Sequence, residues 1–333
     1  MSRATILGAG VMGLCVATEL ARRGHAVTLV DPASGPGGHG CSWWAGGMLA
    51  PFCEFENAEE PVLRHGQAAL DWWEANAGGV TRGGTLVVAL GRDRRELDRF
   101  ARRTQAFDLL DPGAIGALEP DLAGRFERAL FFSGEAHLDP RAALAALVAG
   151  LAVQGIAVQP TLPAEPGQII DCRGLAARDM LPDLRGVRGE MLVLRCPEIS
   201  LARPVRLLHP RVPIYLVPRG DGVFMIGATM IESDRRGVVT ARSVLELLSA
   251  AFALHPAFGE AEILELGADA RPAFPDNLPR IGRATHPDGG DRLYANGLYR
   301  HGYLLAPAVA VQLADHFETG AQPEFWHETD DQR

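Results

Sequence analysis

The residues best placed to do chemistry form a glycine-rich turn near the start of the chain. A GxGxxG motif spans residues 8–13, and Asp31 lies 18 residues after its last glycine. Gly8 permits a tight turn, Gly10 lets a pyrophosphate approach the bare backbone, and Gly13 lets the following helix pack closely. The free N–H groups at the start of that helix then face the phosphates. This spacing predicts the binding of an adenosine dinucleotide.

The sequence around the motif predicts the elements that position it. An apolar strand over residues 4–7 precedes the turn, the helix after it ends at 22–24 with two arginines and a glycine, and a strand over 27–30 leads to Asp31. The Asp31 carboxylate can accept both ribose hydroxyls of adenosine, and it disfavours the 2′-phosphate of NADP. The motif does not separate FAD from NAD, and a structural βαβ unit without ligand is the plain alternative.

Composition narrows the classes of protein. The chain has 333 residues, 47% of them hydrophobic and 22% charged, which is typical of a globular protein with one large or two medium domains. A net charge of −9 argues against a nucleic acid or an anionic membrane as partner, and no apolar run approaches the roughly 20 residues of a membrane span. Five scattered cysteines without CxxC spacing and histidines without HxxxH pairs predict no disulfide framework and no metal site, and they favour a cytoplasmic location.

The order of elements predicts an α/β fold. A βαβ unit opens the chain, a strand and a long apolar helix close it, and a strand-rich segment lies between them. We therefore expect a Rossmann-like nucleotide-binding domain with an inserted, mostly antiparallel substrate domain with helices. The expected boundaries are 1–80, 140–187 and 267–333 for the nucleotide-binding domain, and 81–139 and 188–266 for the substrate domain. Expected elements in the later part are a charged, solvated helix over 91–107, helices over 140–153, 241–254 and 303–318, and strands over 85–90, 190–195, 214–217, 223–228, 263–272 and 292–296.

A second candidate segment lies near the end of the chain. Residues 296–307 form a glycine-containing turn with Arg300 and His301 that enters an apolar helix. The unpaired N–H groups and partial positive charge of a helix start suit the negative charge that a reduced flavin carries at N1 and its C2 carbonyl. This segment therefore favours FAD over NAD.

Together these segments give the chain a family resemblance over nearly its whole length. It resembles the D-amino acid oxidase family of FAD-dependent oxidoreductases, and within it most of all the glycine oxidases of thiamine biosynthesis. The segments that carry the resemblance are 8–13 with Asp31, 42–51, 215–219, 226–229, 271–272 and 300–307.

The resemblance implies a non-covalently bound FAD, with the loop at 45–49 along the isoalloxazine ring and the turn at 302–305 at its pyrimidine end. The implied cofactor-binding residues are Gly8, Gly10, Val11, Met12, Gly13, Asp31, Ser42, Ala45, Gly46, Gly47, Met48, Gly174, Arg300, His301, Gly302, Tyr303, Leu304 and Leu305. Met48 has packing as an equal alternative, and His301 is expected to be structural rather than catalytic.

The resemblance also implies a substrate site of Arg271, Arg300 and Tyr215. A guanidinium matches a planar carboxylate with two parallel bonds, and a tyrosine hydroxyl adds a donor without charge. With the carboxylate fixed, hydride can pass from the α-carbon to flavin N5, and no side-chain base is required. Each residue has a structural alternative: Arg271 could pair with an acid, Arg300 could be solvated and Tyr215 could be core.

The expected reaction is the oxidation of glycine by oxygen to iminoacetate, and so to glyoxylate, ammonia and hydrogen peroxide, in support of thiazole synthesis. D-Proline, hydroxyproline, sarcosine or another D-amino acid is an alternative substrate, and another electron acceptor could replace oxygen. An NAD-dependent dehydrogenase and a flavin-binding protein without substrate are the rivals from other classes. The resemblance further implies a homo-oligomer and a downstream thiazole synthase as possible partner.

Overall fold

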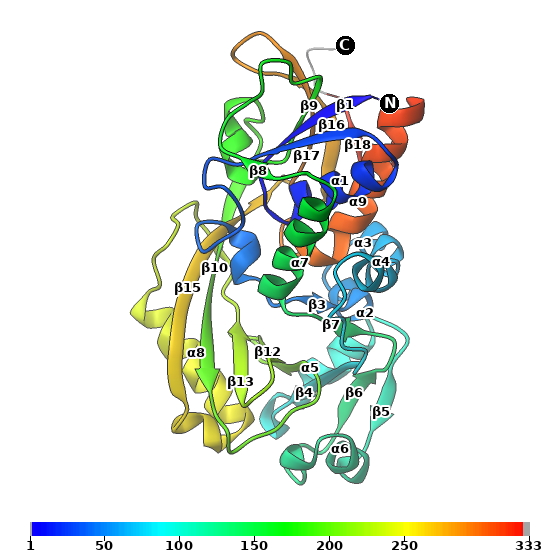
Figure 1. Cartoon of the computed structure of the whole chain (residues 1–333). Coiled ribbons are helices and arrows are strands. Elements are labelled where there is room, and N and C mark those ends of the chain that lie inside the picture. Colours follow the sequence, from blue (N-terminus) through cyan, green and yellow to red (C-terminus); the bar gives the residue numbers. More distant parts are fainter. Residues whose placement is uncertain (1, 329–333) are drawn as a thin grey trace.

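Two β-sheets organise the chain in a computed structural model that describes residues 2–328. In Figure 1 the first sheet lies at the top with helices α1, α7 and α9, and the second sheet lies below it. The α/β class with a Rossmann-like part and a largely antiparallel part is therefore confirmed.

The first sheet has the strand order β18-β16-β17-β9-β1-β2-β8. From β17 to β8 all neighbours are parallel, and β16 pairs with β17 as an antiparallel hairpin. Residues 4–7 of β1 are all buried, as expected for a parallel strand that is covered on both faces. The strands are β1 (Arg3–Leu7), β2 (Ala26–Val30), β8 (Val158–Gln159), β9 (Gln168–Asp171), β16 (Arg280–Thr285), β17 (Asp291–Asn296) and β18 (Trp326–His327).

Three helices form the main hydrophobic core with this sheet. Helix α1 (Val11–Arg22) packs against α9 (Gly302–Thr319) and α7 (Pro140–Val153), and its residues 11–20 are all buried. Helix α7 begins where Asp139 accepts the N–H of Arg141 through its side chain, as an N-cap does. The first residues of α1 and α9 both lie at the same edge of the sheet, where the parallel strands end.

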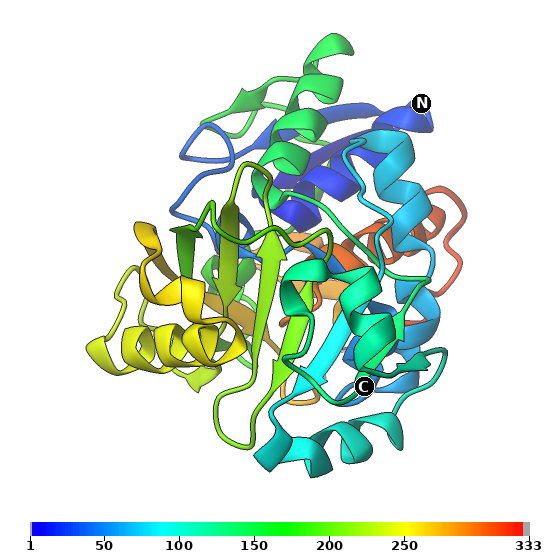
Figure 2. The same cartoon turned by 90° about the horizontal axis from the view of Figure 1, so that it is seen from below.

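The second sheet has the order β14-β10-β13-β12-β11-β4-β6-β5, with β15 paired to β10. Its pairs are antiparallel except for β11 with β4. In the view from below, α8 lies on one flank and β4–β6 with α5 and α6 lie on the other (Figure 2). The bounds are β4 (Thr85–Ala89), α5 (Arg94–Ala101), β5 (Asp108–Leu110), α6 (Pro112–Leu118), β6 (Ala129–Phe132), β10 (Arg185–Arg195), β11 (Val205–Leu208), β12 (Ile214–Pro218), β13 (Val223–Gly227), β14 (Ile231–Glu232), α8 (Ala241–Leu254) and β15 (Glu262–Ala273).

A third group of short elements connects the sheets. Strand β3 follows the long glycine-rich loop and pairs with β7. Helix α2 comes directly after β3 in the chain and lies between the two sheets (Figure 1). The bounds are the 3-10 helix η1 (Cys41–Trp44), β3 (Met48–Leu49), α2 (Pro51–Phe55), α3 (Glu60–Gly66), α4 (Ala69–Asn76), β7 (Ala136–His137) and, with the remaining 3-10 helices, η2 (Gly91–Asp93), η3 (Pro120–Leu122), η4 (Gly174–Asp179) and η5 (Pro256–Gly259).

Sequence-based expectations match the long elements better than the short ones. The helix expected over 91–107 is shorter, because a 3-10 turn precedes α5 and a turn after Arg103 leads into β5. The domain boundaries stay a prediction, since β10 and β15 run across the expected limits at 187 and 267. Among the described residues, no helix combines the length and the apolarity that crossing a bilayer requires.

Glu135 is a buried carboxyl group at the contact between the short elements. Its side chain is fully buried, its Oε1 accepts the N–H of Cys53 in α2 at 2.8 Å, and its Oε2 has no hydrogen-bond partner. Burial raises the pKa of Glu135 to about 7. The group is therefore protonated in the folded protein at pH values where the unfolded chain, with a pKa near 4.3, is ionised.

We expect Glu135→Gln to stabilise the protein at pH 8 by roughly 1–3 kcal/mol and to have less effect at pH 5. Because the pKa of Glu135 is raised in the folded protein, its contribution to the free energy of unfolding is fully present below about pH 4. That contribution is lost as the pH rises through 7. Glutamine mimics the protonated acid and removes the loss. Urea unfolding at both pH values measures the difference, with Glu127→Gln at an exposed position as control. Equal shifts at pH 5 and pH 8 would contradict the prediction.

Candidate functional site

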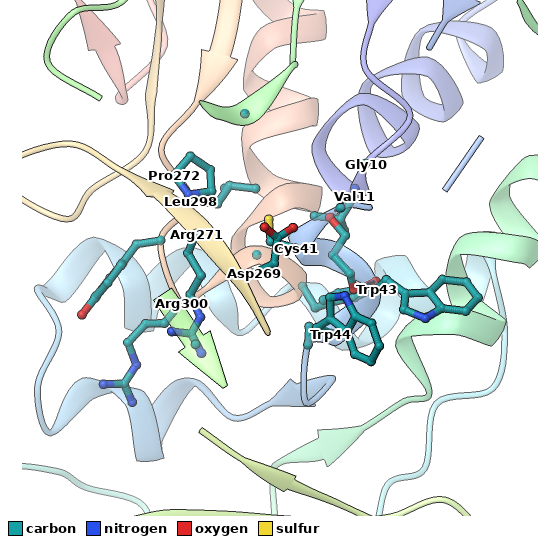
Figure 3. A pocket seen from close by; sticks show the side chains of 18 of the residues that line it. Gly10, Val11, Cys41, Trp43, Trp44, Asp269, Arg271, Pro272, Leu298 and Arg300 are labelled. Atoms are coloured by element: carbon teal, nitrogen blue, oxygen red, sulfur yellow. Dashed lines mark hydrogen bonds between the residues drawn. The ribbon is translucent and has the colours of Figure 1, made fainter. Parts of the chain in front are cut away.

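A cavity of about 510 Å³ lies where the two sheets meet. Its wall combines the GxGxxG turn, the loop at 36–48, the ends of β9 and β15, and the turn before α9. Figure 3 shows Arg271 and Arg300 on one side of the cavity, Trp43 and Trp44 on another, and Gly10 with Val11 beyond them. Cavities of this kind at the carboxyl ends of parallel strands are the usual cofactor sites of α/β proteins.

The glycine turn is packed too tightly for a side chain at Gly8 or at Gly13. Gly8 has a φ of +98°, and a Cβ there would lie 2.7 Å from the Cys172 carbonyl oxygen. A Cβ on Gly13 would lie 1.8 Å from the Gly8 carbonyl oxygen, so α1 touches the turn backbone directly. This contact places the start of α1 at the cavity wall with its N–H groups facing inward.

Asp31 is held at the edge of the same turn. Its Oδ2 accepts the N–H of Ala9 at 2.8 Å and its Oδ1 accepts the N–H of Ala33 at 2.9 Å. Each oxygen keeps a further lone pair, so the fixed carboxylate can still accept ribose hydroxyls. The neighbouring N–H of Val11 donates to the Ser42 hydroxyl oxygen at 3.0 Å, which places Ser42 at the helix start.

The loop before β3 is held between helix α7 and strand β15 of the second sheet. Arg141 makes two 2.8 Å bonds to the Glu265 carboxylate, and its guanidinium lies 4.7 Å from the Trp43 ring centre and 5.2 Å from that of Trp44. The Trp44 ring fills the space beside Gly267, where a Cβ would come within 2.1 Å of it. These contacts join α7, the loop and β15 at the cavity mouth.

Two further donors fix the loop backbone. Arg219 donates to the Gly46 carbonyl oxygen at 2.8 Å and to the Leu138 carbonyl oxygen at 3.2 Å. The Tyr303 hydroxyl donates to the Ser42 carbonyl oxygen at 3.0 Å. The loop that the sequence predicts to lie along a flavin ring is therefore a rigid wall of the cavity.

Arg271 presents its guanidinium at the other end of the cavity. The side chain lies flat over Gly189, where a Cβ would meet Nη2 at 2.2 Å, and Nη1 donates to the Thr229 carbonyl oxygen at 3.2 Å. Within residues 2–328 no carboxylate forms a salt bridge with it. The structural alternative, in which Arg271 pairs with an internal acid, is therefore not what the described residues show, and its second amino group is available to a ligand.

The Tyr215 side chain lies between Gly46 and Gly227 in the wall of the cavity. A Cβ on Gly46 would come within 2.6 Å of the Tyr215 ring, and one on Gly227 would come within 2.7 Å of its hydroxyl oxygen. Burial raises the pKa of Tyr215, although Arg271 and Arg300 oppose the shift. The hydroxyl therefore stays protonated and can donate to a ligand.

Arg300 differs from Arg271 because it has an acidic partner. Its Nη2 lies 2.7 Å from Oε2 of Glu54, a residue of α2. The other oxygen of Glu54 accepts from Nη1 of Arg206 at 3.3 Å. His301 is buried next to this pair, and burial lowers its pKa to about 4, so the imidazole is neutral.

The cavity gathers nearly all of the residues that the sequence indicates. Gly13 and Leu305 lie outside its lining: Gly13 forms the helix contact described above, and Leu305 is fully buried in the core. Lining residues without a role in the sequence analysis include Glu54, Arg206, Arg236, Asp269 and Cys41. Neither a motif nor a spacing marks them, because they become neighbours only through the fold. No cluster of three metal-binding side chains occurs in the part of the chain that the structure describes.

Comparisons with known proteins agree with this geometry. A family model described as FAD dependent oxidoreductase matches residues 3–316. A putative thiamine biosynthesis oxidoreductase ThiO of Rhizobium etli is 58% identical over 330 residues, covering 97% of this chain and 98% of the relative. A glycine oxidase of Pseudomonas aeruginosa is 30% identical over 365 residues, with 96% of each chain covered. The solved iminodiacetate oxidase of Chelativorans sp. BNC1 has the same fold, with a TM-score of 0.79, 24% identity, and coverage of 97% and 96%.

We expect Gly10→Val to fold but to purify without yellow flavin. A Cβ at this position meets only the Ser42 hydroxyl at 3.3 Å, so the protein can adjust, whereas the added methyl groups would occupy the phosphate approach. Absorbance near 450 nm after purification reports FAD, and circular dichroism reports the fold. Gly150→Val is the matched control, because it makes the same substitution at an exposed position of α7 outside the cavity lining, where a Cβ would meet nothing within 4 Å. Yellow Gly10→Val protein would contradict the assignment of the phosphate site.

Proposed function

This chain belongs to the family of FAD-dependent oxidoreductases, and we propose that it oxidises the amine of a small amino acid, with glycine as the preferred substrate. The observation that carries the proposal is the guanidinium of Arg271, which has no carboxylate partner among the described residues and lies in the cavity that also contains the dinucleotide turn. The relatives named ThiO and glycine oxidase support the same choice of substrate.

The residues present fit FAD. The glycine turn and the start of α1 would hold the diphosphate, Asp31 the adenosine ribose, and the clamped loop at 42–48 one side of the ring system. The start of α9 would offer its N–H groups to the pyrimidine end. FAD, when bound, supplies the acceptor for the hydride that leaves the substrate. We propose a non-covalent attachment.

Arg271 would bind the substrate carboxylate through two parallel charge-assisted bonds. Its packing over Gly189 and its bond to the Thr229 carbonyl fix the plane of the fork, which orients the bound carboxylate. Tyr215, held between Gly46 and Gly227, would donate a further hydrogen bond without adding a charge. Together they would present the α-carbon in one orientation.

The amine must be neutral before a hydride can leave the α-carbon. Arg271 and Arg300 both line this part of the cavity (Figure 3), and a positive potential favours the neutral amine over the ammonium ion. The proton would therefore leave to solvent without a side-chain base. His301 is neutral and buried, with its Nδ1 facing Glu54, so we assign it no proton transfer.

With glycine the proposed products are iminoacetate and, from oxygen, hydrogen peroxide; water then converts iminoacetate into glyoxylate and ammonia. The naming of the Rhizobium relative supports a role in supplying thiazole synthesis for thiamine, with a thiazole synthase downstream. The fold neighbour named for iminodiacetate makes an N-substituted glycine the second candidate substrate. Sarcosine, D-proline, hydroxyproline and other D-amino acids remain alternatives, as does an acceptor other than oxygen.

Anaerobic mixing with glycine tests the proposed reaction directly. We expect the flavin absorbance to bleach and to return when air is admitted. A yellow protein that glycine leaves unchanged would overturn glycine as substrate, and sarcosine, D-proline and iminodiacetate would then be tried in the same way. Bleaching that air does not reverse would overturn oxygen as the acceptor.

We expect Arg271→Ala to lower kcat/KM for glycine by on the order of 10³-fold, mainly through KM, with the flavin still bound. The loss corresponds to a bidentate, charge-assisted contact in a water-poor site. Steady-state kinetics with peroxide detection measures it. Arg195→Ala, an exposed arginine on β10 paired with Glu262, is the matched control. An unchanged KM in Arg271→Ala would remove this residue from the substrate site.

A further inference from the structure

Glu54 is a charged group in the cavity wall to which the proposed reaction assigns no role. It is a carboxylate in the wall of a site whose substrate carries a carboxylate of its own. Its side chain is 15% exposed, and its Oε2 lies 2.7 Å from Nη2 of Arg300 and 3.4 Å from Nδ1 of His301. A carboxylate at this position opposes the binding of an anionic substrate, so the presence of Glu54 needs an explanation.

The contacts of Glu54 reach two cations at once. Its Oε2 faces Arg300, its Oε1 accepts from Arg206 at 3.3 Å, and these two arginines come from separate parts of the chain. Burial alone would raise the pKa of Glu54, but Arg300 and Arg206 outweigh it and lower the pKa to about 2. Glu54 is therefore ionised at every working pH, and the three groups share two positive charges and one negative charge.

The arginines at this end of the cavity differ in whether a carboxylate balances their charge. Arg271 has a carbonyl oxygen as its polar partner and offers its full positive charge to a ligand. Arg206 is in addition packed over the Phe100 ring, with its guanidinium 5.3 Å from the ring centre, and donates to the Cys53 carbonyl oxygen. A single carboxylate is thus matched by Arg271, whereas a second carboxylate would have to share Arg300 with Glu54.

We propose that Glu54 is a specificity-determining residue that restricts the site to amines with one carboxylate, by engaging Arg300 and Arg206 and repelling a second anionic group. This inference rests on the proposed function and names its substrate class: glycine and neutral monocarboxylic amines are accepted, and dicarboxylic amines are rejected. Specificity of this kind comes from an unfavourable contact with the wrong ligand rather than from a better one with the right ligand. Iminodiacetate is accordingly a poor substrate of this chain.

A comparison of isosteric ligands separates charge from size. Malonate and its monoamide, malonamate, have nearly the same shape but differ by one negative charge. Their binding to the FAD-loaded wild-type protein can be followed by the change in the visible flavin spectrum, without turnover. We expect malonamate to bind at least about tenfold more tightly than malonate. Equal or tighter binding of malonate would overturn the proposal.

Substitution at Glu54 tests the residue itself. In Glu54→Gln we expect the preference for malonamate to fall by at least about tenfold, because Arg300 then faces the ligand without an anionic neighbour. The same change is expected in the ratio of kcat/KM for iminodiacetate to that for glycine. Glu56→Gln is the matched control, since Glu56 lies two residues away and pairs with Arg99 and Arg103 outside the cavity lining. An unchanged ligand ratio in Glu54→Gln would refute the assignment.

Further comparisons distinguish a failure of the charge selection from a failure of the proposed reaction. Glu54→Asp retains the charge, so it should retain the preference for malonamate; loss of the preference there would overturn the role of charge, even if Glu54→Gln does not retain FAD. If glycine fails to bleach the wild-type flavin while malonamate still binds more tightly than malonate, the proposed substrate fails but the charge selection stands. If glycine bleaches the flavin and iminodiacetate does so equally well, the proposed reaction stands and the charge selection fails.

Discussion

The close contact between α1 and the turn before it is the constraint on which the rest of the site depends. Because Gly13 and Gly8 lack side chains, the helix backbone reaches the turn itself, where a Cβ would be only 1.8 Å from a carbonyl oxygen. This contact sets the direction of α1 and brings its first N–H groups to the cavity. Asp31 is then tied to the same turn through the N–H of Ala9. The proposed phosphate and ribose positions thus depend on the backbone of the glycine turn and on the Asp31 side chain that is bonded to it.

The second requirement is a rigid wall opposite that turn. A long glycine-rich loop is mobile unless other parts of the chain hold its backbone. Here Arg219 and Tyr303 bond to its carbonyl oxygens, and Arg141 stacks on its tryptophans while binding Glu265. Arg141 and Tyr303 belong to helices α7 and α9, Arg219 directly follows β12 of the second sheet, and Glu265 lies on β15 of that sheet. The cavity wall therefore depends on the correct packing of the whole chain, and the fold and the site are stabilised together.

This dependence explains which features the sequence could predict. The glycine turn with Asp31 and the turn that carries Arg300 are local patterns, so their spacing indicates their chemistry. The long strand β15, which carries Arg271, was also expected from its apolar run. Glu54 and Arg206 were not found, because they lie 152 residues apart and meet only when α2 packs against β11. The short strands β3, β5 and β7 also escaped prediction, since two or three residues are too few to show a period.

The balance of charge in the cavity follows from the same geometry. The chain is acidic overall, with a net charge of −9, and yet the proposed function requires its site to hold a diphosphate at one end and a carboxylate at the other. Three arginines at the substrate end without any acid would attract every small anion and would repel one another. Glu54 lies between Arg206 and Arg300 and compensates part of their charge, whereas Arg271 has no carboxylate partner within residues 2–328. The Glu54 carboxylate that compensates Arg206 and Arg300 also repels a second anionic group of a ligand. The proposed selectivity for one carboxylate therefore follows from the same ion pairs that stabilise the two arginines.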